Sequence, residues 1–262
     1  MMKDQFYVGL GGQWRPRLIE LALPAPEGMR GKTLLFATDL HIGDGFAPGR
    51  QWDYLLQRIR GLDADMICWG GDFAEGDWHN KVLGDIATLK PRSGQYSVIG
   101  NNDRAAYFKQ PKLFKGDGFR MLLNEVARAQ WGDCEIGIAG VDDPREGRPD
   151  LSILKDAIAV GGYSVLIAHS PLALQDLPKD TGEWPDLILC GHTHGGQLRA
   201  FGISPYTFGY EKAMGKPHFQ INGVHKIGEK TTLVVSNGIG TSLVPLRIGA
   251  PPQLHLIKFI GL

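Results

Sequence analysis

Short apolar runs alternate with amphipathic or Gly/Pro-rich stretches along the chain, and this alternation is typical of an α/β fold. Six of the runs are rich in Val, Ile and aromatic residues and predict strands, at residues 33–38, 66–69, 96–99, 135–141, 163–168 and 187–190. Helices are predicted where the pattern is amphipathic or where Pro or Gly closes the segment, at residues 51–60, 79–89, 151–160 and 172–177.

The ends of the chain have a different texture. Beyond residue 195 the sequence is rich in glycine, proline and aromatic residues, and the runs 231–235 and 254–259 predict strands of a second, antiparallel layer. Residues 1–31 form an N-terminal extension with one predicted edge strand, 17–23, before a turn region. No repeat, low-complexity tract or linker interrupts the chain, so we predict a single domain over residues 1–262.

Composition narrows the class of protein. A chain of 262 residues that is 43% hydrophobic can bury a sizeable core. Lys and Arg equal Asp and Glu at 28 each, so no basic field favours a nucleic-acid polymer as partner. The three cysteines are odd in number and widely spaced, which favours a reducing compartment. No apolar run approaches the roughly 18 residues of a membrane span, and we expect a cytoplasmic protein.

Five predicted strands are followed directly by side chains that can bind metals. Each block alone is also compatible with an ordinary turn or strand end. The last block is the most specific, because two histidines one residue apart among glycines have little packing purpose. Side chains at the carboxyl ends of neighbouring strands are well placed to share one site. Together they predict a metal centre built from Asp39, His41, Asp72, Asn101, His169, His192 and His194.

In this order, these blocks resemble the calcineurin-like metallophosphoesterase superfamily. Residues 140–144, 191–199, 236–242 and 245–252 look like the bacterial phosphodiesterase branch typified by the YkuE and YaeI proteins. The resemblance implies a metallophosphoesterase-type four-layer sandwich of two mixed β-sheets flanked by helices. It also implies an enzyme that hydrolyses phosphodiester or pyrophosphate bonds with two divalent metal ions and a hydroxide that the two metals share.

The same resemblance assigns roles to the residues. One metal would be held by Asp39, His41 and His194, the other by Asn101, His169 and His192, and Asp72 would bridge the two. The candidate catalytic residues are Asp72, Asn102 and Asp103. Mixed imidazole and oxygen ligands suit manganese, our first choice, or iron or zinc.

Charge and one departure from the family pattern indicate the substrate. Two divalent ions against the carboxylates of Asp39 and Asp72 leave positive charge for a phosphate group. Asn102 stands where the family usually has a histidine that protonates the leaving group or steadies the transition state, and an amide cannot donate a full proton. A phosphate leaving group, with a pKa of about 6, needs less help than an alkoxide at about 15.7. We therefore expect pyrophosphates or activated diesters, with Asn102 and Arg104 as candidate substrate contacts; Arg104 is equally explained as a solvated residue at a helix start.

Two alternatives stay open. One is a UDP-2,3-diacylglucosamine-type pyrophosphatase of lipid A synthesis, whose lipid-linked substrate would need peripheral membrane contact and an apolar platform. Residues 107–115 and 201–214 mix aromatics with charge and are candidates, although packing onto the domain explains them as well. The other alternative is a non-catalytic interaction scaffold of the same fold, which the complete ligand set argues against.

Overall fold

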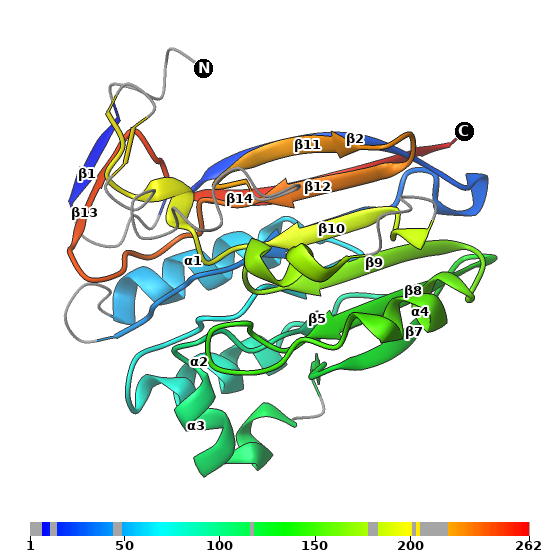
Figure 1. Ribbon diagram of the computed structural model, residues 1–262. Helices are drawn as coiled ribbons and strands as arrows, with labels where there is room; N and C mark the ends of the chain where they lie inside the picture. The colour runs from blue at the N-terminus through cyan, green and yellow to red at the C-terminus, as the bar shows by residue number, and fades with distance from the viewer. Residues whose placement is uncertain are drawn as a thin grey trace.

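Two six-stranded sheets pack against each other in the computed structural model, which describes residues 7–10, 15–43, 49–115, 118–177, 183–200, 203–204 and 220–261 (Figure 1). The first sheet has the order β2-β14-β3-β4-β5-β6. From β3 to β6 its neighbours are parallel, whereas β14 runs antiparallel to β3 and parallel to β2. The strands are β2 (Arg17–Ala25), β14 (Gln253–Gly261), β3 (Thr33–Ala37), β4 (Met66–Trp69), β5 (Gln95–Ser97) and β6 (Arg120–Met121).

The second sheet has the order β11-β12-β10-β9-β8-β7. Its four central strands are parallel, and the two edge strands, β11 and β7, are antiparallel to their neighbours. Both sheets are therefore mixed. The strands are β11 (Gly223–Ile227), β12 (Thr231–Val235), β10 (Leu187–Cys190), β9 (Tyr163–Ala168), β8 (Cys134–Val141) and β7 (Glu125–Trp131).

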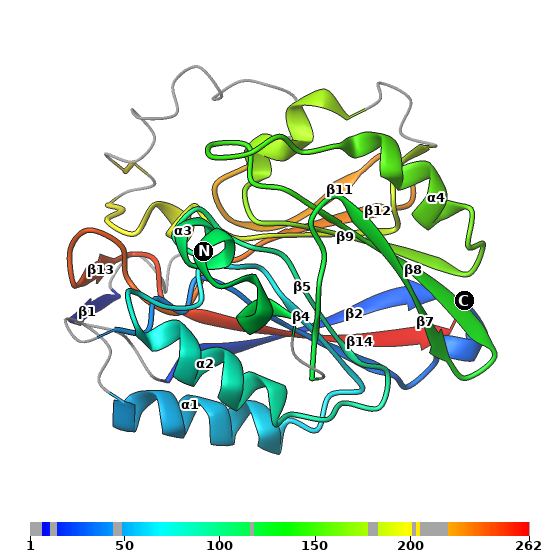
Figure 2. The ribbon, with the colours of Figure 1, turned by 90° about the horizontal axis from the view of Figure 1, so that it is seen from below.

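Helices cover the outer faces of both sheets. Helices α1 (Gly49–Gly61) and α2 (Trp78–Ala87) lie on the first sheet, and α4 (Leu154–Ile158) lies on the second; α3 (Arg104–Lys109) follows the loop after β5. Figure 2 shows the resulting order of helix, sheet, sheet and helix. The expected four-layer fold is confirmed. Among the helices that the structure describes, none is long and apolar enough to cross a membrane.

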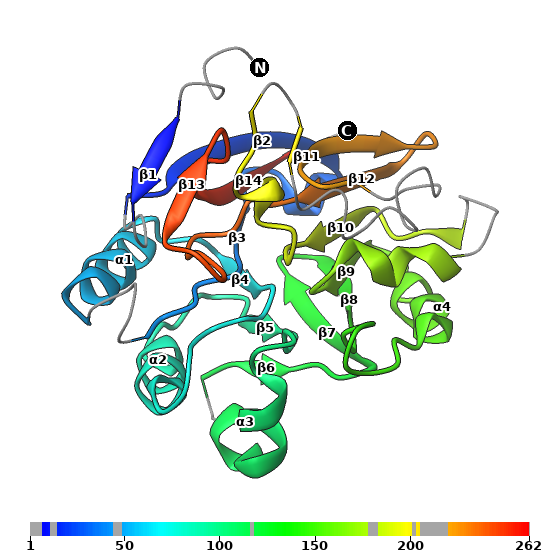
Figure 3. The same ribbon diagram turned by 60° about the vertical axis from the view of Figure 1, so that its left-hand side comes forward.

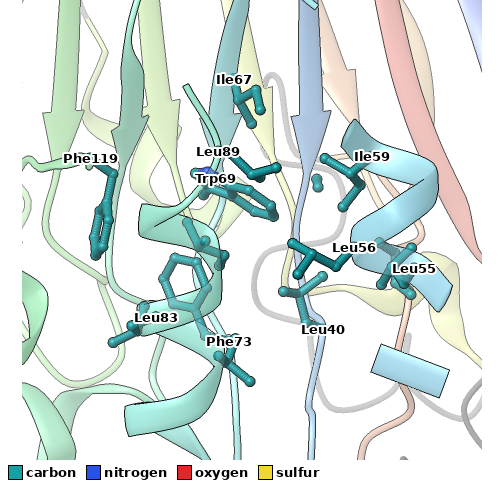
Figure 4. Close-up of a cluster of buried hydrophobic side chains, with 14 of the residues drawn as sticks. Leu40, Leu55, Leu56, Ile59, Ile67, Trp69, Phe73, Leu83, Leu89 and Phe119 are labelled. Carbon is teal, nitrogen blue, oxygen red and sulfur yellow. The ribbon is translucent and has the colours of Figure 1, made fainter. Parts of the chain in front are cut away.

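Apolar side chains fill the spaces between these layers. Helix α1 presents Trp52, Leu55, Leu56 and Ile59, spaced at helical intervals, to the first sheet. Figure 4 shows Leu55, Leu56 and Ile59 in this cluster, in which Trp69 is also fully buried. A second cluster fills the space between the two sheets, and a third lies under α4. Because strands such as β4, β9, β10 and β12 are covered on both faces, they read as continuous apolar runs rather than alternating ones.

The expectation of a second, antiparallel layer after residue 195 is wrong. Strand β12 extends the second sheet in parallel beside β10, and β14 enters the first sheet between β2 and β3. An apolar run shows that a strand is buried, but it does not show which neighbour the strand pairs with. The predicted helix 172–177 is a 3-10 helix at Pro171–Asp176, and residues 151–160 begin with another, Leu151–Ile153, before α4.

A separate two-stranded sheet lies beside the large ones. It pairs β1 (Val8–Leu10) with β13 (Leu246–Ile248) in antiparallel register (Figure 3). Leu198 forms an isolated bridge with Ile248, so the segment that follows the last predicted ligands reaches this small sheet.

The buried Trp69 provides a test of the packing beneath α1 and α2. Its indole nitrogen donates a hydrogen bond to Gln95 Oε1 at 2.9 Å, and its ring is fully buried. We expect Trp69→Ala to lower the free energy of unfolding by about 3–5 kcal/mol, because it leaves a large cavity. Urea denaturation checks this value. The control Ile260→Ala, at a side chain that is 50% exposed, should change the free energy by about 0.5 kcal/mol or less; equal losses in both variants would contradict the packing described.

Candidate metal centre

All seven predicted ligands lie together, on loops that follow the carboxyl ends of strands from both sheets. Asp39 and His41 follow β3, Asp72 follows β4 and Asn101 follows β5 in the first sheet. His169 follows β9, and His192 and His194 follow β10 in the second sheet. Six of the seven side chains are buried, and Asn101 is half-buried. The site therefore lies at the end of the sandwich where the two sheets meet.

The ligand atoms form two groups. Asp39, His41 and His194 make the first group, in which His41 Nε2 lies 3.2 Å from His194 Nε2, and His194 Nε2 lies 3.7 Å from Asp39 Oδ1. Asp72, His169 and His192 make the second. There His192 Nδ1 lies 3.1 Å from His169 Nε2.

Asp72 lies between the two ligand groups, and Asn101 lies next to the second group. Asp72 Oδ2 lies 3.4 Å from His41 Nε2 in the first group and 3.5 Å from His169 Nε2 in its own group. The side-chain oxygen of Asn101 lies 3.3 Å from His169 Nε2. One carboxylate oxygen thus faces both groups, as a ligand shared by two cations would.

The hydrogen bonds around the histidines leave ligand nitrogens facing inward. His169 Nδ1 donates to the carbonyl of Gly70 at 2.7 Å, so Nε2 is the ring atom that is left to bind a metal. His41 Nδ1 lies 2.8 Å from Glu75 Oε1, which favours the same tautomer. Such outer partners orient metal-binding histidines. With imidazole nitrogens, carboxylates and an amide oxygen converging, the residues fit divalent transition metals.

Without bound cations, the pKa values of neighbouring ligand side chains shift in opposite directions. Burial, and then the charge of His169, lowers the pKa of His192 to about 3. Burial acts most strongly and would lower the pKa of His169, but the carboxylates of Asp72, Asp39 and Asp143 together outweigh it and raise that pKa to about 10. Burial raises the pKa of Asp39. A cation bound by the second group would replace the proton on His169, and a cation in each group would stabilise the carboxylates of Asp39 and Asp72.

The backbone of the ligand loops is held in an uncommon conformation. Asp39, His41, Asp72, His192 and His194 have φ between 44° and 68°, in the left-handed region that few residues other than glycine adopt. Nearby glycines let the loops approach each other closely: a Cβ on Gly71 would overlap the backbone of Gly100, and one on Gly100 would overlap the Asp72 carboxylate. Residues held in such conformations cluster at functional sites.

Asp103 supports the centre from behind. Its buried carboxylate accepts hydrogen bonds from the backbone nitrogens of Asp72, Phe73 and Gly100 at 2.6, 2.9 and 3.0 Å. His79 Nε2 lies 3.0 Å from the same carboxylate. Asp103 therefore ties the Asp72 loop to the Asn101 loop, a positioning role that its acidic character alone did not indicate.

Arg247 supports the opposite side. Its fully buried guanidinium donates to the carbonyls of His194, Asn237, Gly240 and Ala250. Burial lowers its pKa to about 10, while the Asp39 carboxylate acts to raise it. One nitrogen also lies 3.0 Å from His194 Nδ1. Coordination of a metal through His194 Nε2 would put the ring proton on Nδ1. Nδ1 and the Arg247 nitrogen would then both be donors, so this contact would open while the four carbonyl contacts remain.

A cavity of about 550 Å³ opens onto the ligands, and among its lining residues are Asp72, Asn101, His192 and His194. Asn102 also lines it, and the Asn102 side-chain nitrogen lies 3.1 Å from both Glu75 Oε1 and His41 Nδ1. Arg145 also lines this cavity. Arg104 instead forms an ion pair with Asp142 at 2.6 Å and does not line the cavity.

The two predicted apolar platforms have different outcomes. In residues 107–115, the Tyr107 ring packs edge-on against Phe114, which is buried, while Phe108 is 60% exposed and lies beneath the Arg104 guanidinium. That stretch packs onto the domain and does not line the cavity. Residues 201–214 lie outside the described residues apart from 203 and 204.

Similarity to known proteins agrees with this geometry. The family model described as Calcineurin-like phosphoesterase matches residues 32–196. The chain is 31% identical over 240 residues to the uncharacterized protein YpbG of Bacillus subtilis, covering 89% of this chain and 84% of YpbG. It is 26% identical to an uncharacterized metallophosphoesterase of Aquifex aeolicus, over 90% of this chain and 87% of that protein. It is also 28% identical to the uncharacterized metallophosphoesterase YkuE of Bacillus subtilis, over 87% and 79%.

Replacing Asp103 tests its positioning role. We expect Asp103→Asn to lower metal affinity by about 10- to 100-fold, because an amide has one acceptor oxygen for the four donors that now face a carboxylate. Each donor left without a partner should also cost about 1–3 kcal/mol of stability. Titration with Mn²⁺ and thermal unfolding of the metal-free protein measure the two effects. A variant that keeps both properties but loses only kcat would show that Asp103 acts in the chemical step instead.

Proposed function

The chain belongs to the calcineurin-like phosphoesterase family and is a metal-dependent phosphoesterase, and we propose that it hydrolyses phosphodiester or pyrophosphate bonds at a binuclear centre. The resemblance recognised from the sequence motifs is thereby confirmed at the level of the family. The number of metals, the mechanism and the bond that is cleaved are our proposal.

The observation that carries the proposal is the position of Asp72. One of its oxygens faces His41 and His169, which belong to different ligand groups. Asp72 Oδ1 accepts a hydrogen bond from the backbone nitrogen of Asn102 at 2.8 Å, which fixes the orientation of the carboxylate. A carboxylate fixed between two sets of ligands is suited to hold two cations close together.

The residues around Asp72 would bind and orient the substrate. When bound, two divalent ions supply Lewis-acid neutralisation of the phosphoryl oxygens and lower the pKa of a water so that it can attack phosphorus. The half-buried amides of Asn101 and Asn102 face the cavity, and Arg145 adds a positive charge to its lining. Manganese remains our first choice, with iron or zinc as alternatives.

The leaving group should be a good one. Asn102 offers an amide where the family usually has an imidazole, and an amide that lies 3.1 Å from Glu75 Oε1 and from His41 Nδ1 has no acidic proton to give to a leaving group. This supports pyrophosphates and activated diesters over simple alkyl monoesters. A phosphate-containing small molecule or a lipid-linked phosphate both satisfy this condition; the narrower UDP-2,3-diacylglucosamine-type activity remains one case of the second. A non-catalytic scaffold is disfavoured because all seven ligand positions are filled and lie together.

Removal of the shared carboxylate tests the binuclear centre. We expect Asp72→Ala to retain less than one metal per chain and to lose at least about 1000-fold in kcat/KM on bis-p-nitrophenyl phosphate with Mn²⁺, because both ligand groups lose their common anion. Elemental analysis of protein purified without chelator measures the metal. Asp53→Ala, at an exposed carboxylate on α1, is the matched control and should behave as the unaltered protein. Near-normal turnover by Asp72→Ala would disprove the bridging role.

Substitution at Asn102 tests the leaving-group argument. We expect Asn102→His to raise kcat/KM about 10- to 100-fold for methyl aryl phosphates with poor leaving groups and to change good ones little, because an imidazole there could donate a proton and Glu75 is close enough to orient it. Asn102→Gln keeps an amide and is the control. The measurement is the dependence of log kcat/KM on the pKa of the leaving group, which should flatten for Asn102→His alone. A parallel shift of the whole line would contradict this account.

A further inference from the structure

An exposed leucine stands on the rim of the metal cavity in a strained backbone. Leu243 is 97% exposed and has φ of 63°, a conformation that is unusual for a bulky apolar residue. Its neighbour Val244 is 42% exposed, and both side chains line the cavity that contains Asp72 and His192. Contact with water does not explain why a large apolar side chain is held on the surface in a strained backbone conformation.

The rim loop is fastened to the ligand loop by one side chain. Gln197 Nε2 donates to the carbonyls of Ser242 and Val244 at 2.8 and 3.0 Å, and Gln197 Oε1 accepts from the Ser242 nitrogen at 2.8 Å. Gln197 is buried and lies three residues after His194. Leu243 is therefore presented at a defined place relative to the metal ligands rather than on a free loop.

Exposed apolar side chains continue from the rim of the cavity onto the two-stranded β1–β13 sheet. Val8 and Leu10 on β1 are 65% and 78% exposed, and they lie directly opposite Ile248 and Leu246 of β13. Residues directly opposite each other in a sheet point to the same face. Leu198, which lines the cavity, is bridged to Ile248 and so continues that face.

We propose that this surface, from Leu198 and Leu243 to Leu10, binds the hydrocarbon chain of an amphiphilic phosphodiester or pyrophosphate substrate. The inference rests on the proposed function, because it places the phosphate of that substrate at the metal ligands. The cavity lining combines metal ligands and Arg145 with the apolar residues Leu198, Leu243 and Val244. A lipid with a phosphate head and a hydrocarbon tail combines the same two kinds of chemistry.

Alkyl p-nitrophenyl phosphates test the inference, since the leaving group stays constant while the chain lengthens. Because an open surface buries each methylene only about halfway, we expect kcat/KM to rise about twofold per methylene, or about 100-fold from the methyl to the octyl ester, below the micellar concentration of each ester and with Mn²⁺. Absence of hydrolysis of both the methyl ester and a dinucleoside pyrophosphate would overturn the proposed function itself. Hydrolysis of the methyl ester with no dependence on chain length would overturn only the inference about the chain.

Matched variants locate the chain on the protein. Leu243→Asn removes the apolar side chain with a residue that tolerates the left-handed backbone, and it should lower the octyl-to-methyl ratio of kcat/KM about tenfold. Val224→Asn, at a valine on β11 that is 43% exposed and absent from the cavity lining, should leave the ratio unchanged. Circular dichroism checks that both variants fold. An unchanged ratio in Leu243→Asn would overturn the assignment, as would vesicle binding that depends on Leu243 while turnover does not depend on chain length.

Discussion

The crowding of metal-binding atoms around the Asp72 carboxylate is the constraint on which the rest of the site depends. His41 Nε2 and His194 Nε2 lie 3.2 Å apart, and Asp72 Oδ2 lies within 3.5 Å of two imidazoles. Buried acceptors at such distances need positive charge between them. The groups that hold them, among them Asp103, Glu75 and Arg247, contact the ligands or their loops from outside and leave the inward-facing atoms free.

Backbone strain and buried charge are not spread evenly over the structure. The ligand loops carry five residues in left-handed backbone, and the support comes from ordinary hydrogen bonds to backbone atoms on either side. Arg247 is itself a buried cation, and its four carbonyl partners come from the loops after β10, β12 and β13. Backbone strain and the burial of charged groups thus occur in the loops where the ligands converge, whereas the sheets behind these loops consist of regular, apolar strands.

Much of this could be predicted from sequence, for a definite physical reason. Strands β4, β9, β10 and β12 begin and end where their apolar runs do, because both of their faces are covered. The ligands were visible because each stands next to such a run. Strand β7 was missed because Glu, Arg and Gln interrupt its apolar residues and leave no continuous apolar run. The pairing of β14 depends on contacts across more than 200 residues. Glu75, Arg247 and Leu243 carry no spacing pattern, so only the folded chain shows what they face.

The place of β14 has a consequence for how the protein is made. This strand lies between β2 and β3, and β3 leads directly to Asp39 and His41. All seven ligands precede β14 in the chain, so a ribosome releases every metal-binding residue before the strand that completes their supporting sheet. Until β14 is made, β3 lacks one of the two neighbours with which it pairs in the folded protein. Stable metal binding is therefore expected only after β14 has paired with β3, because β3 leads into the loop that carries Asp39 and His41.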